Sequence, residues 1–147
     1  MEIRKLTEKD ITSINKLQTE LGYKEISKIH GWMYGAFQKK ELVGIVGVFP
    51  YRRLPHKDYP NGYIAEIGAL YVKDSFRRMG IATKLLQFAM EKTANKGLDA
   101  YVIDCTKDSY RIFKSLGFEE STEYRMWKQN KFYNRKKIFK TVCSPSC

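Results

Sequence analysis

Apolar positions alternate with polar ones in some segments of the chain and recur every three or four residues in others. Alternation over residues 3–6 predicts a short strand, and apolar residues at helical spacing over 11–21 predict the first helix. Thr7 and Asp10 are residue types favoured at a helix start, so we expect the helix to begin beside them. A second, short helix is predicted over residues 24–30.

The middle of the chain carries the strongest strand signals. Two apolar stretches, over residues 32–38 and 42–49, predict a hairpin that turns at residues 39–41. Residues 50–62 contain three of the four prolines and predict a loop. Residues 63–72, rich in branched and aromatic side chains, then predict the most clearly marked strand of the chain.

Helix and strand signals alternate in the last third of the chain. A helix is predicted over about residues 79–96, because apolar residues recur there at spacings of three and four. A short apolar strand over 100–104 and a helix over 108–116 follow, and further strands are predicted from Phe118 and over 122–127. This order, without an internal repeat, predicts an α/β (α+β) domain built on one central sheet.

The positive charge of the chain is concentrated near its C-terminus. The 147 residues suit one domain, which we expect over residues 1–128, followed by a basic tail over residues 129–147 that is part of the domain or appended to it. The formal net charge is +11, and seven lysines and arginines but no acidic residue follow Glu123. Aromatic residues alternate with basic ones in the tail, as in nucleic-acid-binding segments. We expect a solvated chain end instead, and therefore no nucleic-acid partner.

Composition also bounds the location and the cofactors of the protein. No stretch approaches the roughly 20 apolar residues of a membrane span, and the first residues lack the apolar core of a signal peptide. Three cysteines are too few for a disulfide framework, and they form no metal-ligand spacing with the two histidines. We expect a cytoplasmic protein with neither a membrane partner nor a bound metal.

One segment carries recognisable chemistry. The predicted strand ends at Val72, the basic pair Arg77 and Arg78 follows, and a helix opens with Gly80 and the small Ala82. The first backbone N–H groups of a helix have no partner within it and lie at the positive end of its dipole, so they suit a phosphate group. An ordinary helix start with basic surface residues explains the same pattern. The segment is neither a Walker loop nor a three-glycine dinucleotide motif.

This segment resembles the signature of the GCN5-related N-acetyltransferase (GNAT) family. Arg77-x-x-Gly80-x-Ala82 is similar to the family's Gln/Arg-x-x-Gly-x-Gly/Ala, which cradles the pyrophosphate of acetyl-CoA. The runs 70–72 (Leu-Tyr-Val) and 116–118 (Leu-Gly-Phe) are similar to motifs that end the family's fourth strand and close its last helix. The opening strand and helix match as well, so that the resemblance covers nearly all of the chain up to about residue 128.

The resemblance implies a fold, an activity and a cosubstrate. The fold would be a mixed, mostly antiparallel sheet flanked by helices, with its fourth and fifth strands splayed to bind acetyl-CoA. The activity would be N-acetyltransfer from acetyl-CoA to a primary amine of a small molecule or peptide, by direct attack in a ternary complex and without a metal. A homodimer is compatible with the exposed edges of such a sheet.

The resemblance also assigns roles to individual residues. Backbone groups of Leu70 and Val72 would pair with the pantetheine arm, amides from Arg78 to Thr83 would hold the pyrophosphate, and the amide near Leu70 would stabilise the oxyanion. The predicted cosubstrate-binding residues are Leu70, Tyr71, Val72, Arg77, Arg78, Met79, Gly80, Ile81, Ala82, Thr83, Ser109 and Phe113.

Proton transfer is assigned to Glu66 and, more weakly, to Tyr110. Glu66 lies eleven residues before Arg77, as does the glutamate base of histone-acetylating relatives, and period two places it on one strand face with Leu70. A solvent-facing or salt-bridged glutamate is an equal alternative. Phe113 occupies the position where many relatives carry a tyrosine that protonates the leaving thiolate, and Tyr110 lies one helical turn earlier. The catalytic set predicted is Glu66, Leu70 and Tyr110.

Three alternatives stay open from the sequence. Phe113 in the place of an acid is compatible with a CoA-binding regulatory module that has lost turnover, and the basic tail with a nucleic-acid-binding protein. Cys105 invites a covalent mechanism, although no histidine lies near it in sequence and a structural thiol is the expected role. His56 lies in the proline-containing loop that would border the acceptor site.

Overall fold

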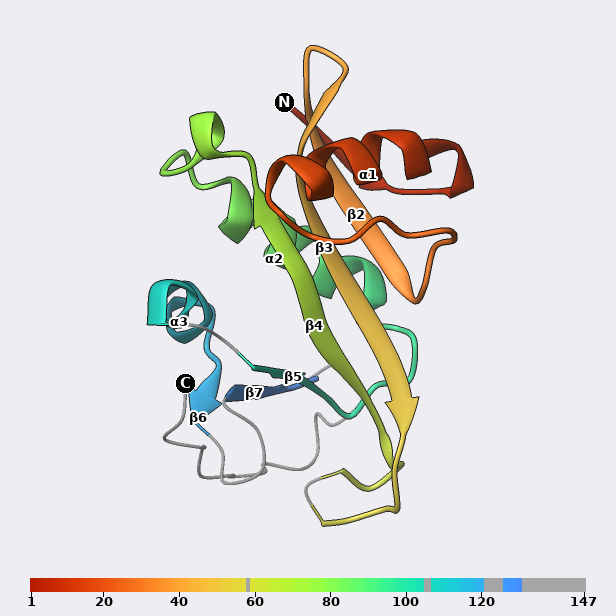
Figure 1. Cartoon of the computed structure of the whole chain (residues 1–147). Coiled ribbons are helices and arrows are strands. Elements are labelled where there is room, and N and C mark those ends of the chain that lie inside the picture. The colour runs from red at the N-terminus through yellow and green to blue at the C-terminus, as the bar shows by residue number, and fades with distance from the viewer. Residues whose placement is uncertain (58, 105–106, 121–125, 131–147) are drawn as a thin grey trace. The chain divides into compact units, whose positions relative to one another are not determined.

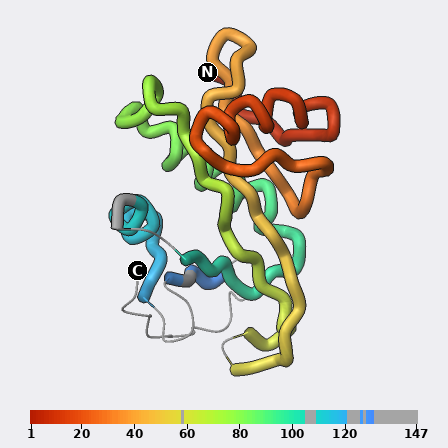
Figure 2. The backbone as a smooth tube through the Cα atoms, in the orientation of Figure 1, coloured from red at the N-terminus to blue at the C-terminus, as the bar shows by residue number. Residues whose placement is uncertain are grey.

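The computed structural model describes residues 1–57, 59–104, 107–120 and 126–130, and these are coloured in Figure 2. The chain folds as two compact units: the first unit comprises residues 1–48 and 69–89, and the second comprises 49–68 and the described residues from 90 onward. The hydrogen-bonded strand order is β1-β2-β3-β4-β5-β7-β6, and strands β3 and β4 contribute to both units.

The first unit begins with a helix between two strands and continues with a hairpin. Its first elements are β1 (Glu2–Lys5), the 3₁₀ turn η1 (Glu8–Asp10), α1 (Ile11–Glu20), β2 (Trp32–Gln38) and the first part of β3 (Glu41–Arg52). β1 and β3 pair antiparallel with the two sides of β2. Lys39 and Lys40 both have positive φ, 49° and 68°, as a two-residue hairpin turn requires. The predicted hairpin is confirmed.

Asp10 organises the start of the first helix. Its carboxylate accepts a hydrogen bond of 2.8 Å from the Thr7 backbone N–H and two further bonds, of 3.0 and 2.9 Å, from the Arg4 guanidinium. These contacts hold the pKa of the Asp10 carboxyl below its usual value, chiefly through the bond from Arg4. The predicted helix start at Thr7 and Asp10 is confirmed.

The predicted helix over residues 24–30 is wrong. This segment follows α1 as a loop of bends and irregular backbone. The Asn15 side chain accepts a hydrogen bond of 2.7 Å from the Ile26 N–H and donates one of 3.0 Å to the Ile26 carbonyl. Ile26 and Ile29 also pack against the hydrophobic core. Backbone partners and buried apolar area therefore come from tertiary contacts, and a local helix is not needed.

Two helices cover opposite faces of the strands in the first unit (Figure 1). On one face, α1 residues Ile14 and Leu17 pack into a cluster with Ile45 of β3. On the other face, α2 (Ile81–Thr93) lies over Gly44, the neighbour of Ile45. β4 (Tyr63–Val72) and the 3₁₀ turn η2 (Asp74–Phe76) lead into α2. The predicted helix over 79–96 is thus confirmed with shorter ends.

The second unit is built around a parallel pair of strands. β4 pairs with β5 (Ala100–Ile103) from Ile64↔Ala100 to Glu66↔Val102. β7 pairs antiparallel with β5 and with β6, and the remaining elements are α3 (Lys107–Ser115), β6 (Glu119–Glu120) and β7 (Met126–Gln129). Its core joins Tyr59 to Ile64, Ala100 and Val102. The sheet is mixed and mostly antiparallel, which confirms the predicted fold class.

The loop predicted over residues 50–62 is shorter than expected. β3 continues through Pro50 to Arg52, and the Arg53 N–H donates a 2.8 Å hydrogen bond to the Gly62 carbonyl. The remaining segment is anchored by Asp99, whose buried carboxylate accepts bonds from the Asn61 side chain at 2.7 Å and the Asn61 N–H at 2.9 Å. The strand β3 therefore continues past Pro50, and the buried Asp99 carboxylate fixes the loop near Asn61.

Candidate functional site

The start of α2 presents free backbone donors. The helix begins at Ile81, and the Lys84 N–H makes a 3.1 Å hydrogen bond to the Gly80 carbonyl. The N–H groups of Ile81, Ala82 and Thr83 therefore precede the first helical bond and have no partner inside the helix. They lie at the positive end of the helix dipole, where an anionic oxygen is stabilised.

The turn before α2 has positive φ angles of the kind that gather backbone N–H groups around an anion. Arg78 and Gly80 both have left-handed backbone conformations, with φ of 63° and 76°, and such residues alternating with ordinary ones turn successive N–H groups toward one point. A Cβ placed on Gly80 would meet nothing within 4 Å. The glycine is therefore required by its φ and by no neighbouring protein atom, and the space beside it is open to a ligand. The residues present thus fit a bound pyrophosphate.

The two arginines of the motif have different surroundings. The Arg77 guanidinium lies 3.0 Å from the Asp74 carboxylate and donates from Nε to the Val72 carbonyl at 3.2 Å, so it ties the turn to the end of β4. The exposed Arg78 has no ion pair among the described residues. Both arginines were predicted to add positive charge to the site. Arg77 has a further role, because its contacts anchor the turn.

The end of β4, Leu70–Val72, is half-buried and fixed on one side by β3. The backbone N–H of Lys73 donates a 2.8 Å bond to the Val43 carbonyl. The Tyr71 ring stacks on Tyr23, with centroids 4.1 Å apart. The Lys73 ammonium pairs with Glu41 at 3.0 Å and Glu20 at 3.6 Å, which joins this strand end to β3 and α1.

One backbone residue changes the geometry expected of β4. Ala69 has a φ of 49°, a left-handed conformation that interrupts the regular pleat of a strand. The expectation that Glu66 and Leu70 share a face assumed unbroken alternation between them, and this assumption is wrong for β4. Only the segment on each side of Ala69 alternates regularly.

In the second unit, Glu66 lies next to a second carboxylate. Glu66 is opposite Val102 in the parallel ladder, and Asp104 follows two residues later. Glu66 is an exposed residue, but its carboxyl group is partly shielded from water, and this desolvation raises its pKa. The negative charge of Asp104 raises the pKa further. A carboxylate with a raised pKa is a stronger base near neutral pH. Asp104 was not among the site residues predicted from the sequence. The signal that could have identified it is its position as an acidic residue at the end of the strand that pairs in parallel with the Glu66 strand.

The residues predicted on α3 have unequal exposure. Ser109 and Tyr110 are half-buried, whereas Phe113 is 1% exposed and packs edge-on against Phe118, with centroids 5.1 Å apart. Phe113 is therefore a core residue of the second unit, and its contact with a cosubstrate stays a prediction. Cys105 lies outside the described residues. His56 forms a bridge with Tyr59 in the loop after β3.

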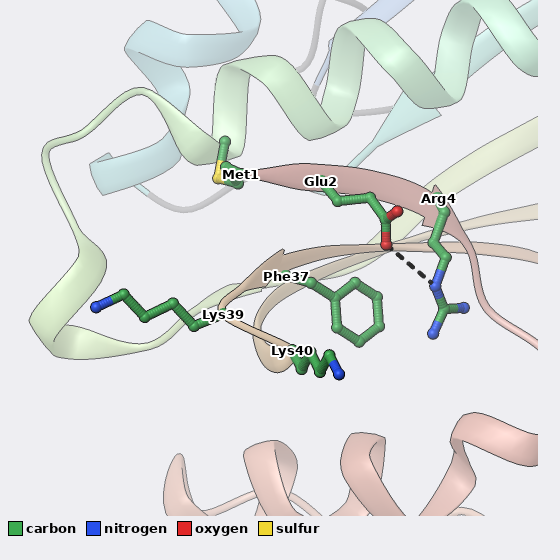
Figure 3. Close-up of a pocket in the computed structure, with 6 residues that line it drawn as sticks. All are labelled: Met1, Glu2, Arg4, Phe37, Lys39 and Lys40. Carbon is green, nitrogen blue, oxygen red and sulfur yellow. Dashed lines mark ion pairs between the residues drawn. The ribbon is translucent and has the colours of Figure 1, made fainter.

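A separate hollow of about 350 Å³ lies beside β1 and the β2–β3 turn (Figure 3). Arg4 lies 4.2 Å from the centre of the Phe37 ring, and Lys39 points away from that ring. None of the site residues predicted from the sequence lines this hollow. Its lining residues are Met1, Glu2, Arg4, Phe37, Lys39 and Lys40.

Within the described ranges, no three His, Cys, Asp or Glu side chains are grouped to hold a metal ion. No helix in those ranges is both long and apolar enough to span a membrane.

Known proteins resemble this chain in sequence and in fold. The family model described as "Acetyltransferase (GNAT) family" matches residues 4–118. Thialysine N-epsilon-acetyltransferase of Mus musculus is 32% identical over 75 residues, which span 49% of this chain and 42% of the mouse protein.

Solved structures share the fold at low sequence identity. A predicted acetyltransferase from Clostridium acetobutylicum, crystallised with acetyl-CoA, superposes with a TM-score of 0.71 at 16% identity, covering 84% of this chain and 92% of the other. A GCN5-related N-acetyltransferase from Ralstonia eutropha gives 0.69 at 18% identity, covering 82% and 94%.

Proposed function

The chain belongs to the acetyltransferase (GNAT) family, and on that premise we propose that it transfers an acetyl group from acetyl-CoA to a primary amine. The amine belongs to a small molecule or a peptide. The observation that carries the proposal is the left-handed turn at Gly80, where the space is open and free amides of α2 suit the pyrophosphate of the cosubstrate.

Cosubstrate binding uses two adjoining segments of the first unit. The amides from Arg78 to Thr83 hold the pyrophosphate, and the exposed Arg78 adds positive charge beside them. Backbone groups of Leu70 and Val72 pair with the pantetheine amides in the manner of an added strand. Arg77 keeps these two segments together through its bond to the Val72 carbonyl. Tyr71 and Met79 complete the proposed set in this unit, and Ser109 and Phe113 of the second unit stay predictions that the family resemblance implies.

Transfer proceeds by direct attack of the amine nitrogen on the thioester carbonyl. The acceptor reaches the site as an ammonium of pKa about 10 and must first lose a proton, which passes to Glu66 directly or through water. The C–N bond forms, the amide near Leu70 stabilises the oxyanion, and the C–S bond breaks to release the CoA thiolate. Tyr110 donates a proton to that thiolate, whose own pKa of about 8.5 makes it a fair leaving group. The newly bonded nitrogen gives up its second proton through water, and this proton restores the Tyr110 hydroxyl.

An amine at the end of a flexible chain is the acceptor class that the comparison favours. The mouse relative is named for acetylating the ε-nitrogen of thialysine, an aminoalkyl compound. The Glu66–Asp104 pair supports a cationic acceptor in this chain as well, and it opposes the bias against polycations that the net charge alone suggests.

A panel of amines tests the proposal. Release of free CoA thiol from acetyl-CoA is followed with diamines, lysine-like amino acids and lysine-containing peptides, and the products are identified by mass. Amine-dependent release with an added acetyl group on the amine is the expected result. CoA binding with no transfer to any amine would favour the regulatory module, for which the buried Phe113 in the acid's position is the supporting observation.

A further inference from the structure

Gly44 is a buried glycine in the middle of β3, on the face that α2 covers. Glycine weakens a strand interior relative to residues with side chains, so its presence there calls for a spatial reason. A Cβ at this position would lie 3.1 Å from Leu85 Cδ1, 3.3 Å from Ile81 Cγ2 and 3.3 Å from the Tyr71 carbonyl oxygen. All three contacts are close enough that a neighbour would have to move by a few tenths of an ångström.

Two of these neighbours belong to the first turns of α2. Ile81 and Leu85 are 4% and 0% exposed, so neither has free space into which to rotate. Ile81 is also the first helical residue, and its N–H is one of the free donors. The bond from the Lys84 N–H to the Gly80 carbonyl links the turn as one unit. A methyl group on residue 44 would therefore displace the donors together with the side chains.

The third neighbour belongs to the strand that is proposed to hold pantetheine. The Tyr71 carbonyl lies between Leu70 and Val72, whose backbone groups are assigned to that arm. A side chain at position 44 would thus press on both halves of the proposed cosubstrate site, the start of α2 and the end of β4.

We propose that Gly44 is a positioning residue for acetyl-CoA: its missing side chain sets how closely the first turn of α2 lies to β3 and to the end of β4. This inference rests on the proposed function, because it concerns the same cosubstrate site. Gly44 touches no cosubstrate itself. It acts through Ile81, Leu85 and the Tyr71 carbonyl.

The test compares CoA affinity in matched variants of the full chain by isothermal titration calorimetry. Gly44→Ala should raise the Kd for CoA about three- to tenfold, since displaced amides hold the pyrophosphate less well and a tenfold loss corresponds to weakening roughly one charged hydrogen bond. Gly35→Ala is the control. A Cβ on Gly35 would lie 2.6 Å from Leu42 and 2.7 Å from Leu6, an even tighter clash that involves no residue of α2.

The control separates positioning from loss of stability. Gly35→Ala should lower Tm through its own clashes with Leu42 and Leu6 while leaving the Kd for CoA unchanged. Adding Leu85→Val to Gly44→Ala removes the closest clash and should restore the Kd toward that of Leu85→Val alone. This pair also carries the comparison if Gly44→Ala alone does not fold.

Three results would overturn the inference. They are a wild-type Kd in Gly44→Ala, equal losses of CoA affinity in the two glycine variants, and a double variant that binds no better than Gly44→Ala. Wild-type protein that does not bind CoA would overturn the proposed function instead, and the inference with it.

Discussion

Glu66 on β4 and Asp104 after β5 interact unfavourably across the parallel ladder of the second unit. The ladder places Glu66 opposite Val102, and Asp104 follows two residues later. Burial and this neighbouring charge act in the same direction on the Glu66 carboxyl and raise its pKa. The charge of Asp104, which was not predicted from the sequence to matter, therefore acts on the residue that is proposed as the base.

The pH dependence of the reaction should report this interaction. A base works only when deprotonated, so kcat/KM should fall as pH drops through the raised pKa of Glu66. Asp104→Asn removes one of the two causes of the shift, and the acid limb should move to lower pH. Rate profiles of wild type and variant over pH 4–9, a range of about five units around the reference value, give the comparison.

Glu66→Gln is the companion variant. It should lower kcat by roughly 10²- to 10⁴-fold and remove the acid limb, while the Kd for CoA changes little. An acid limb that survives in Glu66→Gln would assign the base to another group or to water alone.

Gly80→Ala tests the phosphate turn. The substitution places a methyl group in the space open to pyrophosphate and strains a left-handed backbone, so the Kd for CoA should rise at least about tenfold. The strain alone should cost roughly 1–2 kcal/mol of stability.

Gly22→Ala provides the matched control for that experiment. Gly22 has a φ of 82°, close to that of Gly80, and a Cβ there would also meet nothing within 4 Å. Thermal unfolding should show a similar loss in both variants, whereas calorimetry should show a loss of CoA affinity in Gly80→Ala alone. Equal affinities would mean that the turn at Gly80 is only structural.

Asp10→Asn should destabilise the protein in a pH-dependent way. Because the pKa of Asp10 is lowered in the folded state, its contribution is present above the unfolded value of about 3.9 and is lost as pH falls through the folded value. Near neutral pH the variant should lose about 1 kcal/mol, a modest figure because Arg4 is partly exposed. Urea unfolding at pH 7 and pH 3 should show a gap between the two proteins that narrows in acid.

Phe113→Tyr should not create a general acid for the thiolate, although it restores the tyrosine that many relatives carry at this position. The added hydroxyl would enter a core where Phe113 is 1% exposed against Phe118, so we expect a loss of roughly 1–3 kcal/mol in unfolding free energy and no gain in kcat. Unfolding curves and steady-state rates measure the two quantities. A higher kcat would show that position 113 reaches the leaving thiolate.

Local patterns were sufficient for the hairpin, for β4 and for the three described helices to within a few residues. The strand predicted over 122–127 lies mostly outside the described residues. Two apolar stretches predicted the β2–β3 hairpin although Lys39 and Lys40 are not residues typical of its left-handed turn. The helix over 24–30 failed because Asn15, eleven residues away from Ile26, supplies the backbone partners that a helix would otherwise provide.

The features that the sequence could not predict depend on register between distant segments. Asp104 becomes relevant to Glu66 only when β4 and β5 are aligned in parallel. Gly44 gains its role only when α2 is placed on β3. The left-handed Ala69 has no signal of its own, since alanine is not a residue that favours this conformation.

The central claim is that the turn at Gly80 and the end of β4 bind the pyrophosphate and pantetheine of acetyl-CoA. Calorimetric titration of the full wild-type chain with CoA tests it most directly, with adenosine 3′,5′-bisphosphate as a ligand that lacks both of these groups. The account predicts saturable binding of CoA with one site per chain and much weaker binding of the bisphosphate. Absence of CoA binding, or equal affinity for the two ligands, would contradict it.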